Sequence, residues 1–283
     1  MKTDKTRQHY LRKLEERWDK MTITSDPLFG LVMENEQICH GLIQRAIPEI
    51  TVTKIKRIET QKDISSYGLD RKVRYDVYVE DDRDRIYVIE MQMVNQHNLP
   101  ARLRYYQEQI DSELLMPGDD YQKLLNYPTY VIMFCNFDYF QRGWAKYQFD
   151  FACTRDRQLK LGDNRTVVVF NATANTFAED EPMRNFLQLM RNQVVANDNF
   201  VQTIQNEIKK IKQSPERRRG FMKFELDLMD ARREGFNAGR EDGIRELIQS
   251  LRQANFPDDD IRKSLMNGFH LTAERAQEYL HRY

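Results

Sequence analysis

Residues 73–93 read VRYDVYV, EDDRDR and IYVIEMQM, two runs rich in β-branched and aromatic residues around a charged connection. This pattern is typical of a β-hairpin. Side chains alternate between the two faces of a strand, so Glu90 shares a face with Gln92. A short turn near residues 82–84 sets Asp76 opposite Glu90, and facing residues of such a pair have Cβ atoms about 4.5–5.5 Å apart. The hairpin therefore predicts two neighbouring carboxylates.

Those two carboxylates need an explanation. Two acids held this close repel each other unless a positive charge lies between them. A hard divalent cation with oxygen ligands is the natural partner. The alternative is that Asp76 and Glu90 lie on a solvated face of the sheet. The apolar run around Glu90 weighs against it, because such runs belong to strands covered on both faces, where an unpaired carboxylate is costly.

Four motifs in order resemble the PD-(D/E)XK nuclease superfamily and, within it, the recombination-promoting nuclease or putative transposase branch. They are RYDVYV from Arg74, IEMQ from Ile89, LPxRxRYY from Leu99 and GDDY from Gly118. The resemblance spans roughly residues 25–173. It implies an α/β fold with a restriction-endonuclease-like core, in which helices flank a mixed central sheet of about four strands plus an added hairpin. An all-α C-terminal tail follows this core.

The resemblance also implies a Mg²⁺-dependent DNA nuclease site, in which Mn²⁺ is a possible substitute. Asp76 and Glu90 match the two metal-binding acids, and the backbone carbonyl of Met91 is the third ligand. Gln92 matches the last motif position, which is Lys in the wider superfamily. Glutamine is usual in this branch but removes a charge. A second interpretation therefore stays open: a catalytically weak or inactive nuclease-fold protein that binds DNA or protein.

Two further residues are candidates for the site. The superfamily often supplies an extra acid from the first core helix, predicted here over residues 28–46, and Glu36 is the candidate; the alternative is a solvated surface acid. Pro100 opens a later helix. On it, the planar guanidinium of Arg102 is suited to a scissile phosphate or, equally, to a structural salt bridge. The apolar stripe expected to face the core there comprises Leu103, Tyr106, Ile110 and Leu114.

Four more segments are predicted as strands from their β-branched content, their alternation or both. The turn signal Gly162-Asp163-Asn164 precedes the last of them, so the final two are expected to form the added hairpin. These segments are residues 51–60, 130–136, 144–152 and 165–171.

Composition limits the partners and the compartment. The 283 residues carry 44 basic and 44 acidic side chains, so DNA binding must come from a local basic patch rather than from global charge. The chain has no apolar run near 18 residues and no apolar signal-peptide core, so we expect no membrane span and a cytoplasmic protein. Its three cysteines are unclustered, as expected for buried thiols of a reducing compartment.

The chain is expected to divide into a charged N-terminal helix over residues 1–24, a nuclease core over 25–180 and a helical region over 181–283. The last region includes a long helix, predicted from Pro215 to residue 254, with Gly235, Gly239 and Gly243 spaced by four. This spacing suits either close contact with a partner helix or a marginal helix. Since most soluble oligomers are symmetric homodimers, we expect these helices to mediate a homodimer.

One basic cluster near the start of that region has two readings. It is either a solvated charged face or a contact surface for the DNA backbone. The cluster consists of Lys209, Lys210, Lys212, Arg217, Arg218 and Arg219.

Overall fold

The computed structural model describes residues 2–64, 73–178 and 181–283. The chain divides into two compact units. One unit is Glu15–Arg218, and the other combines Met1–Leu14 with Arg219–Tyr283. Each unit is treated by itself below.

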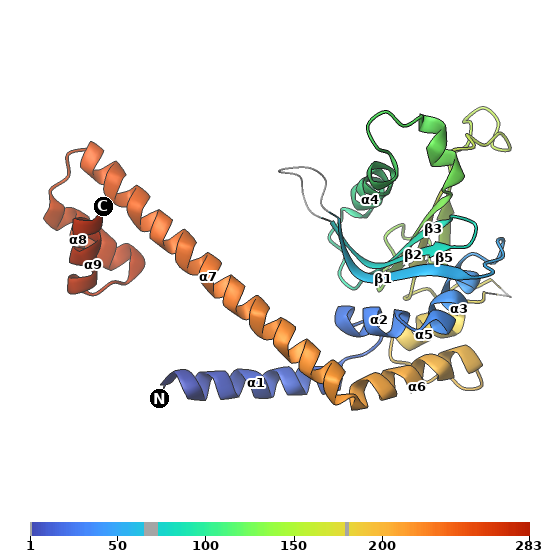
Figure 1. The fold of residues 1–283 in the computed structure, drawn as a ribbon, viewed down its shortest axis with the longest axis horizontal. Coiled ribbons are helices and arrows are strands. Elements are labelled where there is room, and N and C mark those ends of the chain that lie inside the picture. The colour runs from blue at the N-terminus through green and yellow to red at the C-terminus, as the bar shows by residue number, and fades with distance from the viewer. Residues whose placement is uncertain (1, 65–72, 179–180) are drawn as a thin grey trace. The chain divides into compact units, whose positions relative to one another are not determined.

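A six-stranded mixed sheet forms the centre of the Glu15–Arg218 unit, in the order β1-β2-β3-β4-β6-β5 (Figure 1). The first three strands form an antiparallel meander, β3, β4 and β6 run parallel, and β5 returns antiparallel to β6. This arrangement confirms the mixed sheet with an added hairpin. The strands are β1 (Ile55–Ile64), β2 (Val73–Asp81), β3 (Ile86–Gln92), β4 (Thr129–Cys135), β5 (Lys146–Phe149) and β6 (Arg165–Asn171).

The first strand starts four residues later than expected, at Ile55 rather than residue 51. Side chains from neighbouring elements bind the backbone before it. Arg85 donates to the carbonyl of Thr51 at 2.7 Å. Gln44 accepts from the N–H of Val52 at 3.0 Å, and the Val52 carbonyl lies 2.7 Å from a His40 ring nitrogen. These side chains take the place of the strand hydrogen bonds that the β-branched residues at positions 51–53 had predicted.

Helices cover both faces of the sheet (Figure 1). On one face lie α2 (Asp26–Met33), α3 (Glu36–Ala46) and α5 (Arg184–Met190), with α6 (Asn199–Gln213) packed against them. On the other face lies α4 (Leu99–Leu114), which also contacts the short 3-10 helix η1 (Tyr121–Asn126). The helix α1 (Lys2–Lys20) reaches this unit through its C-terminal part, where Trp18 is fully buried and donates to the carbonyl of Lys212 at 3.3 Å.

The single helix predicted over residues 28–46 is wrong, because the segment is divided into α2 and α3. Asn35 has an extended backbone, and its side chain accepts from the N–H of Ile38 at 3.3 Å. An asparagine that caps a helix in this way starts a new one. The capping signal was present in the sequence, but continuous apolar periodicity across it predicted one helix.

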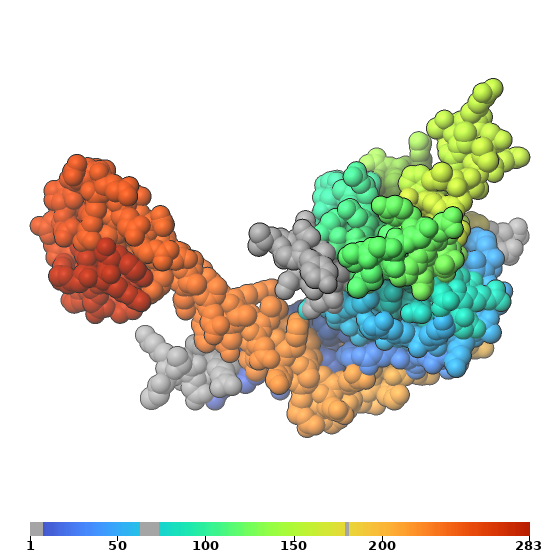
Figure 2. Space-filling model, turned by 45° about the horizontal axis from the view of Figure 1, so that its top comes forward, coloured from blue at the N-terminus to red at the C-terminus, as the bar shows by residue number. Residues whose placement is uncertain are grey.

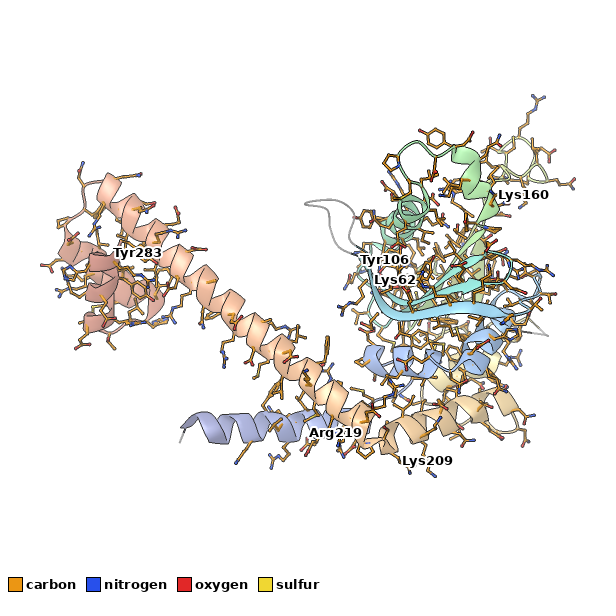
Figure 3. The ribbon with its side chains drawn as sticks, viewed as in Figure 1. Lys62, Tyr106, Lys160, Lys209, Arg219 and Tyr283 are labelled. Carbon is orange, nitrogen blue, oxygen red and sulfur yellow. The ribbon has the colours of Figure 1, made fainter. Side chains whose placement is uncertain are left out.

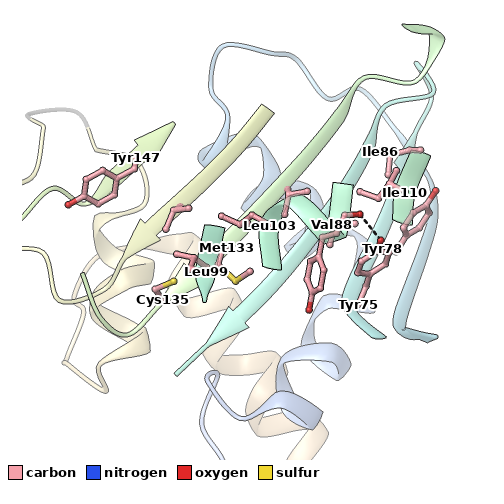
Figure 4. Close-up of a cluster of buried hydrophobic side chains, with 13 residues drawn as sticks. Tyr75, Tyr78, Ile86, Val88, Leu99, Leu103, Ile110, Met133, Cys135 and Tyr147 are labelled. Carbon is pink, nitrogen blue, oxygen red and sulfur yellow. Dashed lines mark hydrogen bonds between the residues drawn. The ribbon is translucent and has the colours of Figure 1, made fainter. Parts of the chain in front are cut away.

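A buried cluster joins α4 to the sheet, as expected from the apolar stripe of that helix. Figure 4 shows Leu103 and Ile110 of α4 over Val88 and Met133 of the sheet. The hydroxyl of Tyr75 donates to the backbone carbonyl of Tyr106 at 3.0 Å inside this cluster. These contacts fix both the position and the rotation of α4 on the sheet.

The second unit carries its own small core. The end of α7 (Pro215–Gln253) packs with α8 (Asp258–Phe269) and α9 (Ala273–Arg282) around a cluster that includes Ile248, Leu265 and Leu280. Figure 3 shows the side chains of this cluster near Tyr283. Gly243 faces Phe269, with 3.6 Å between that ring and the place of a Cβ. No helix in the described ranges is long and apolar enough to cross a bilayer.

The β2–β3 turn is fixed by a buried ion pair. Asp81 is fully buried and accepts four hydrogen bonds, two from the backbone N–H groups of Arg83 and Arg85 and two from side chains. The Nε of Arg85 donates at 2.6 Å and the hydroxyl of Tyr87 at 2.8 Å. One carboxylate thereby sets the turn that brings β2 and β3 into register.

We expect Asp81→Ala to lower the free energy of unfolding by about 3–5 kcal/mol, because it leaves the Arg85 guanidinium buried without a counter-charge. Urea denaturation followed by circular dichroism measures the loss. Asp82→Ala, at an exposed position of the same turn, is the matched control. A loss no larger than that of the control contradicts the role given to the buried pair.

Candidate active site

Asp76 of β2 and Glu90 of β3 meet at the end of the β2–β3 ladder. The ladder ends with Val77 paired to Ile89, which places Asp76 opposite Glu90, as expected. Beyond it, the acids bind the free backbone donors. The Asp76 N–H donates to Glu90 Oε1 at 3.0 Å, and the Met91 N–H donates to Asp76 Oδ2 at 2.9 Å. Each carboxylate is thus held by the strand that carries the other.

Two side chains of α4 converge on Glu90, which is fully buried. Arg102 donates to Glu90 Oε2 at 2.8 Å, and the Tyr106 hydroxyl donates to the same oxygen at 3.1 Å. The Nε of Arg102 in turn donates to the Tyr106 hydroxyl at 2.8 Å. Arg102 therefore forms a salt bridge, which was one of its two expected roles, and its partner is Glu90 of the acid pair. Figure 3 labels Tyr106, the other α4 residue that reaches Glu90.

Gln92 lies on the same face of β3 as Glu90, two residues further on. Its side-chain oxygen accepts from Arg102, and its Nε2 donates to the carbonyl of Val94 at 2.7 Å. The amide is therefore oriented by a donor on one side and an acceptor on the other. A neutral side chain in this position leaves Arg102 as the cation nearest the acids.

A third acid approaches the pair from the opposite face of the sheet. Asp26, at the start of α2, is hydrogen-bonded to Asp76 and adds negative charge near both Asp76 and Glu90. Gln61 of β1 holds it by donating to Asp26 Oδ1 at 2.8 Å. Glu36, the acid expected from this region, is exposed in the first turn of α3, where its charge acts on Cys39. The interactions around the pair therefore involve Asp26 rather than Glu36.

Burial dominates the protonation of the acid pair. Desolvation raises the pKa of Asp76, and the neighbouring charges of Glu90 and Asp26 raise it further. Desolvation also raises the pKa of Glu90, while the Asp76 N–H, Arg102 and Tyr106 oppose that rise. Negative charge on this pair is therefore costly, and a cation bound between the acids lowers that cost.

The donor set fits a hard cation. Among the described residues, no three His, Cys, Asp or Glu side chains are arranged as a metal cluster. Mg²⁺ usually takes only one or two carboxylates from a protein and keeps several waters. Asp76 and Glu90 supply those carboxylates. The carbonyl of Met91 points to the same side of β3 as its N–H, which faces Asp76.

The fold and the site together define a nuclease-type α/β domain with its acids at the end of a hairpin. The family model of the PD-(D/E)XK nuclease family transposases matches residues 27–171 of the chain. The chain belongs to this family. No curated protein and no solved structure matches it at a significant level. The resemblance inferred from the four motifs is confirmed, and the match contains the whole α4 helix and both hairpin acids.

Sequence reasoning missed two members of the cluster. Tyr106 was assigned to the apolar stripe of α4, but its hydroxyl reaches Glu90 while its ring packs in the core. Its spacing of four from Arg102 was the available signal, because residues four apart share a helix face. Asp26 had no such signal, since only tertiary packing of α2 brings it to β2.

The basic cluster near the end of α6 is largely occupied by contacts within its own unit. Lys212 donates to the carbonyl of Asp19 at 2.8 Å, and Arg218 pairs with the Asp19 carboxylate at 3.3 Å. Arg217 pairs with Glu34 at 2.6 Å. These ion pairs hold the ends of α1 and α2 against the start of α7, a structural role that neither sequence-based alternative for the cluster included.

We expect Asp76→Asn to stabilise the metal-free protein at alkaline pH. The folded-state pKa of Asp76 lies above the unfolded value, so stability from its protonation is complete below about pH 4 and is lost as pH rises through the folded pKa. The amide removes that loss. At pH 8 in chelator, Tm should rise by about 2–4 °C, the shift that about 1 kcal/mol produces in a chain of this size.

Differential scanning calorimetry at pH 5 and pH 8 makes this measurement. The gain should shrink at pH 5, and Asp82→Asn, at an exposed carboxylate of the β2–β3 turn, should show no comparable gain. An Asp76→Asn protein less stable than the wild type at pH 8 contradicts the prediction. That result means that the neighbours of Asp76 stabilise its charge more than burial disfavours it.

Proposed function

We propose that this protein is a metal-dependent DNA endonuclease that hydrolyses phosphodiester bonds, with Mg²⁺ as cofactor and Mn²⁺ as a substitute. The observation that carries the proposal is the pair of Asp76 and Glu90, the first half-buried and the second fully buried, held opposite each other beside the Arg102 guanidinium. Membership of a nuclease family supports the reaction class. Transposition, recombination and defence are processes in which such an activity is used.

Asp76, Glu90 and the Met91 carbonyl are the groups proposed to hold the cation. When bound, the ion supplies a Lewis acid and lowers the pKa of a water. The backbone N–H groups of Asp76 and Met91 keep the carboxylates oriented, because each donates to the acid of the opposite strand. Asp26 adds a third carboxylate next to Asp76, which is the role that Glu36 had in the sequence-based expectation.

The α4 side chains are proposed to act on the substrate. Arg102 presents a planar fork of N–H donors suited to a phosphodiester. Its present partners, Glu90 and Gln92, are the groups that it leaves or shares when a phosphate enters. Tyr106 keeps Glu90 oriented through its hydroxyl, and Gln92 offers a neutral amide that positions a water without altering its pKa.

A second candidate is a nuclease-fold protein that binds DNA or protein without cutting it. Two observations favour it: the chain has as many acidic as basic residues, and the Gln92 amide is already engaged on both sides. This candidate predicts that a chelator leaves binding unchanged. Calorimetric titration with Mg²⁺ or Mn²⁺ separates the two, because only the enzyme gives a binding heat that Asp76→Ala removes.

We expect the wild-type protein to nick supercoiled plasmid in Mg²⁺ or Mn²⁺ and not in chelator. Asp76→Ala and Glu90→Ala should each lower the rate by at least about a hundredfold, which corresponds to about 2.7 kcal/mol of activation free energy. Gel electrophoresis of the plasmid over time measures the rate. Cleavage that survives both substitutions in a folded protein removes this site from the proposal.

A matched pair of substitutions decides which helix acid serves the site. Asp26→Asn should slow nicking, since it removes charge next to Asp76, whereas Glu36→Gln should leave the rate close to that of the wild type. The reverse outcome restores Glu36 as the third acid. Circular dichroism on both variants excludes loss of the fold as the cause.

We also propose that α7 mediates a homodimer, which would bring two single-strand cuts together. Gly235 and Gly239 have open space where a Cβ would lie, and Phe236 between them is 69% exposed. Multi-angle light scattering should give a dimer for the full chain and a monomer for residues 1–214. Phe236→Glu should weaken the dimer without altering metal binding. A full-length monomer, or a truncated chain that still dimerises, contradicts this assignment.

A further inference from the structure

A cavity lies between α4 and the β5–β6 hairpin. Its volume is about 380 Å³, which is within the range of small-ligand sites. Three phenylalanines from the hairpin and the loop before it form an aromatic wall. The connection between β5 and β6 stands out from the surface as the yellow-green segment of Figure 2. These phenylalanines are Phe140, Phe149 and Phe151.

The aromatic wall presents ring surface to solvent. Phe149 is 43% exposed and Phe151 is 55% exposed, although both line the cavity. Phe149 packs against Phe140 with 5.0 Å between ring centroids, so its position is supported from behind. The guanidinium of Arg165 lies over the ring of Phe151, 5.2 Å from its centroid. Aromatic rings held in this way offer flat surfaces on which another planar group can stack.

The floor of the cavity contains an unused hydrogen-bond donor. Gln107 of α4 is only 6% exposed, and its buried Nε2 has no partner among the described residues. A buried amide nitrogen without an acceptor loses about 1–3 kcal/mol relative to a satisfied one. A primary amide carries both a donor and an acceptor, the pair that matches the edge of a nucleobase. The Nε2 lies beneath the cavity surface, so it donates to a polar, planar ligand once the Gln107 side chain turns toward the cavity.

The cavity also has one unpaired charge at its edge. Arg104 is exposed and forms no ion pair with the described residues, whereas Arg165 pairs with Asp163 and Asp150 pairs with Lys160. The next space along α4 is lined by the acids Glu108 and Asp111 together with Arg104 and Arg165, so its charges are mixed. Arg104 is therefore the side chain at which a phosphate meets a positive charge without an acid partner in the described ranges. The charges suit one or two nucleotides rather than a long track of backbone.

The geometry of α4 links this cavity to the acids. Arg102 and Tyr106 form the stripe that binds Glu90, and Leu103 and Gln107 form the stripe that lines the cavity. Each stripe is spaced by four, and the two are offset by one residue, about 100° around the helix. A strand with one phosphate at Arg102 therefore has its neighbouring nucleotides within reach of the cavity.

We propose that this cavity binds an unstacked base of a single DNA strand, with its ring on Phe149, its edge on Gln107 and its phosphate on Arg104. The inference rests on the proposed nuclease function for its choice of ligand. An apolar protein segment also fits an aromatic groove, but it leaves the amide and the guanidinium without partners. The structure thus assigns a preference for unpaired DNA next to the acid cluster.

The test measures affinity rather than cleavage. Fluorescence anisotropy in chelator compares a labelled single-stranded oligonucleotide with the duplex of the same sequence. Phe149→Ala should weaken single-strand binding about tenfold, the usual effect of removing one stacking platform. Gln107→Leu should weaken it by about three- to tenfold through the lost hydrogen bond. Phe256→Ala, at an exposed phenylalanine that does not line the cavity, is the matched control and should have no effect.

A second readout follows the base itself. An oligonucleotide with one 2-aminopurine should change its fluorescence when the wild-type protein binds, and Phe149→Ala and Phe149→Leu should both remove that change. Phe149→Leu keeps an apolar side chain, so its loss of signal identifies the aromatic face rather than the fold as the cause. Duplex binding should be the same in all variants.

The outcomes separate this inference from the nuclease proposal. Unchanged single-strand affinity in Phe149→Ala, an equal loss on duplex, or no single-strand binding by the wild type each overturns the base site. Cleavage with unchanged affinity in the variants overturns the base site alone. Phe149-dependent binding of single strands by a protein that cuts no DNA supports the base site and rejects the enzyme.

Discussion

The position of two facing carboxylates, Glu90 fully buried and Asp76 half-buried, is the constraint on which the rest of this domain depends. Asp76 and Glu90 lie where the β2–β3 ladder ends, and each satisfies a backbone N–H of the other strand. Their negative charge is compensated from α4, whose Arg102 reaches across to Glu90. A buried acid that lacks such partners is unstable in a protein interior. The site therefore depends on where α4 lies and on which face of α4 is polar.

Much of this arrangement could be read from the sequence, because it follows from local periodicity. Alternation in β2 and β3, together with the turn expected near residues 82–84, places Asp76 opposite Glu90 without knowledge of any other element. The motif order then identifies the family and hence the mixed sheet. The sequence offers no reason to prefer the capping signal of Asn35, which divides the helix, over the continuous apolar periodicity around it, which predicts a single helix. Asp26 could not be found at all, because its approach to Asp76 depends on how α2 packs, and no pattern within α2 encodes that.

Charged residues were the least predictable part of the chain. The densest basic run in the sequence suggests a surface for a polyanion, yet Arg217 and Arg218 are bound by acids from α1 and α2. Exposed Arg104, in contrast, lies outside this basic run and has no ion pair within the described part of the chain. Composition counts charges but does not show which are already neutralised. The partners of each charged side chain in the structure show whether it holds helices together or is free to bind a ligand.

The rotation of α4 has a consequence for how this family can vary. The hydrogen bond from Tyr75 to the Tyr106 carbonyl fixes the helix against the sheet. One residue inserted in α4 between Arg102 and Tyr106 turns these two side chains by about 100° relative to each other, so that they no longer both reach Glu90. The connection before the helix, residues 93–98, is not helical, so a change in its length does not rotate the side chains of α4. Length changes during evolution are therefore tolerable in the loop, whereas within the helix they are compatible with the site only in steps of whole turns.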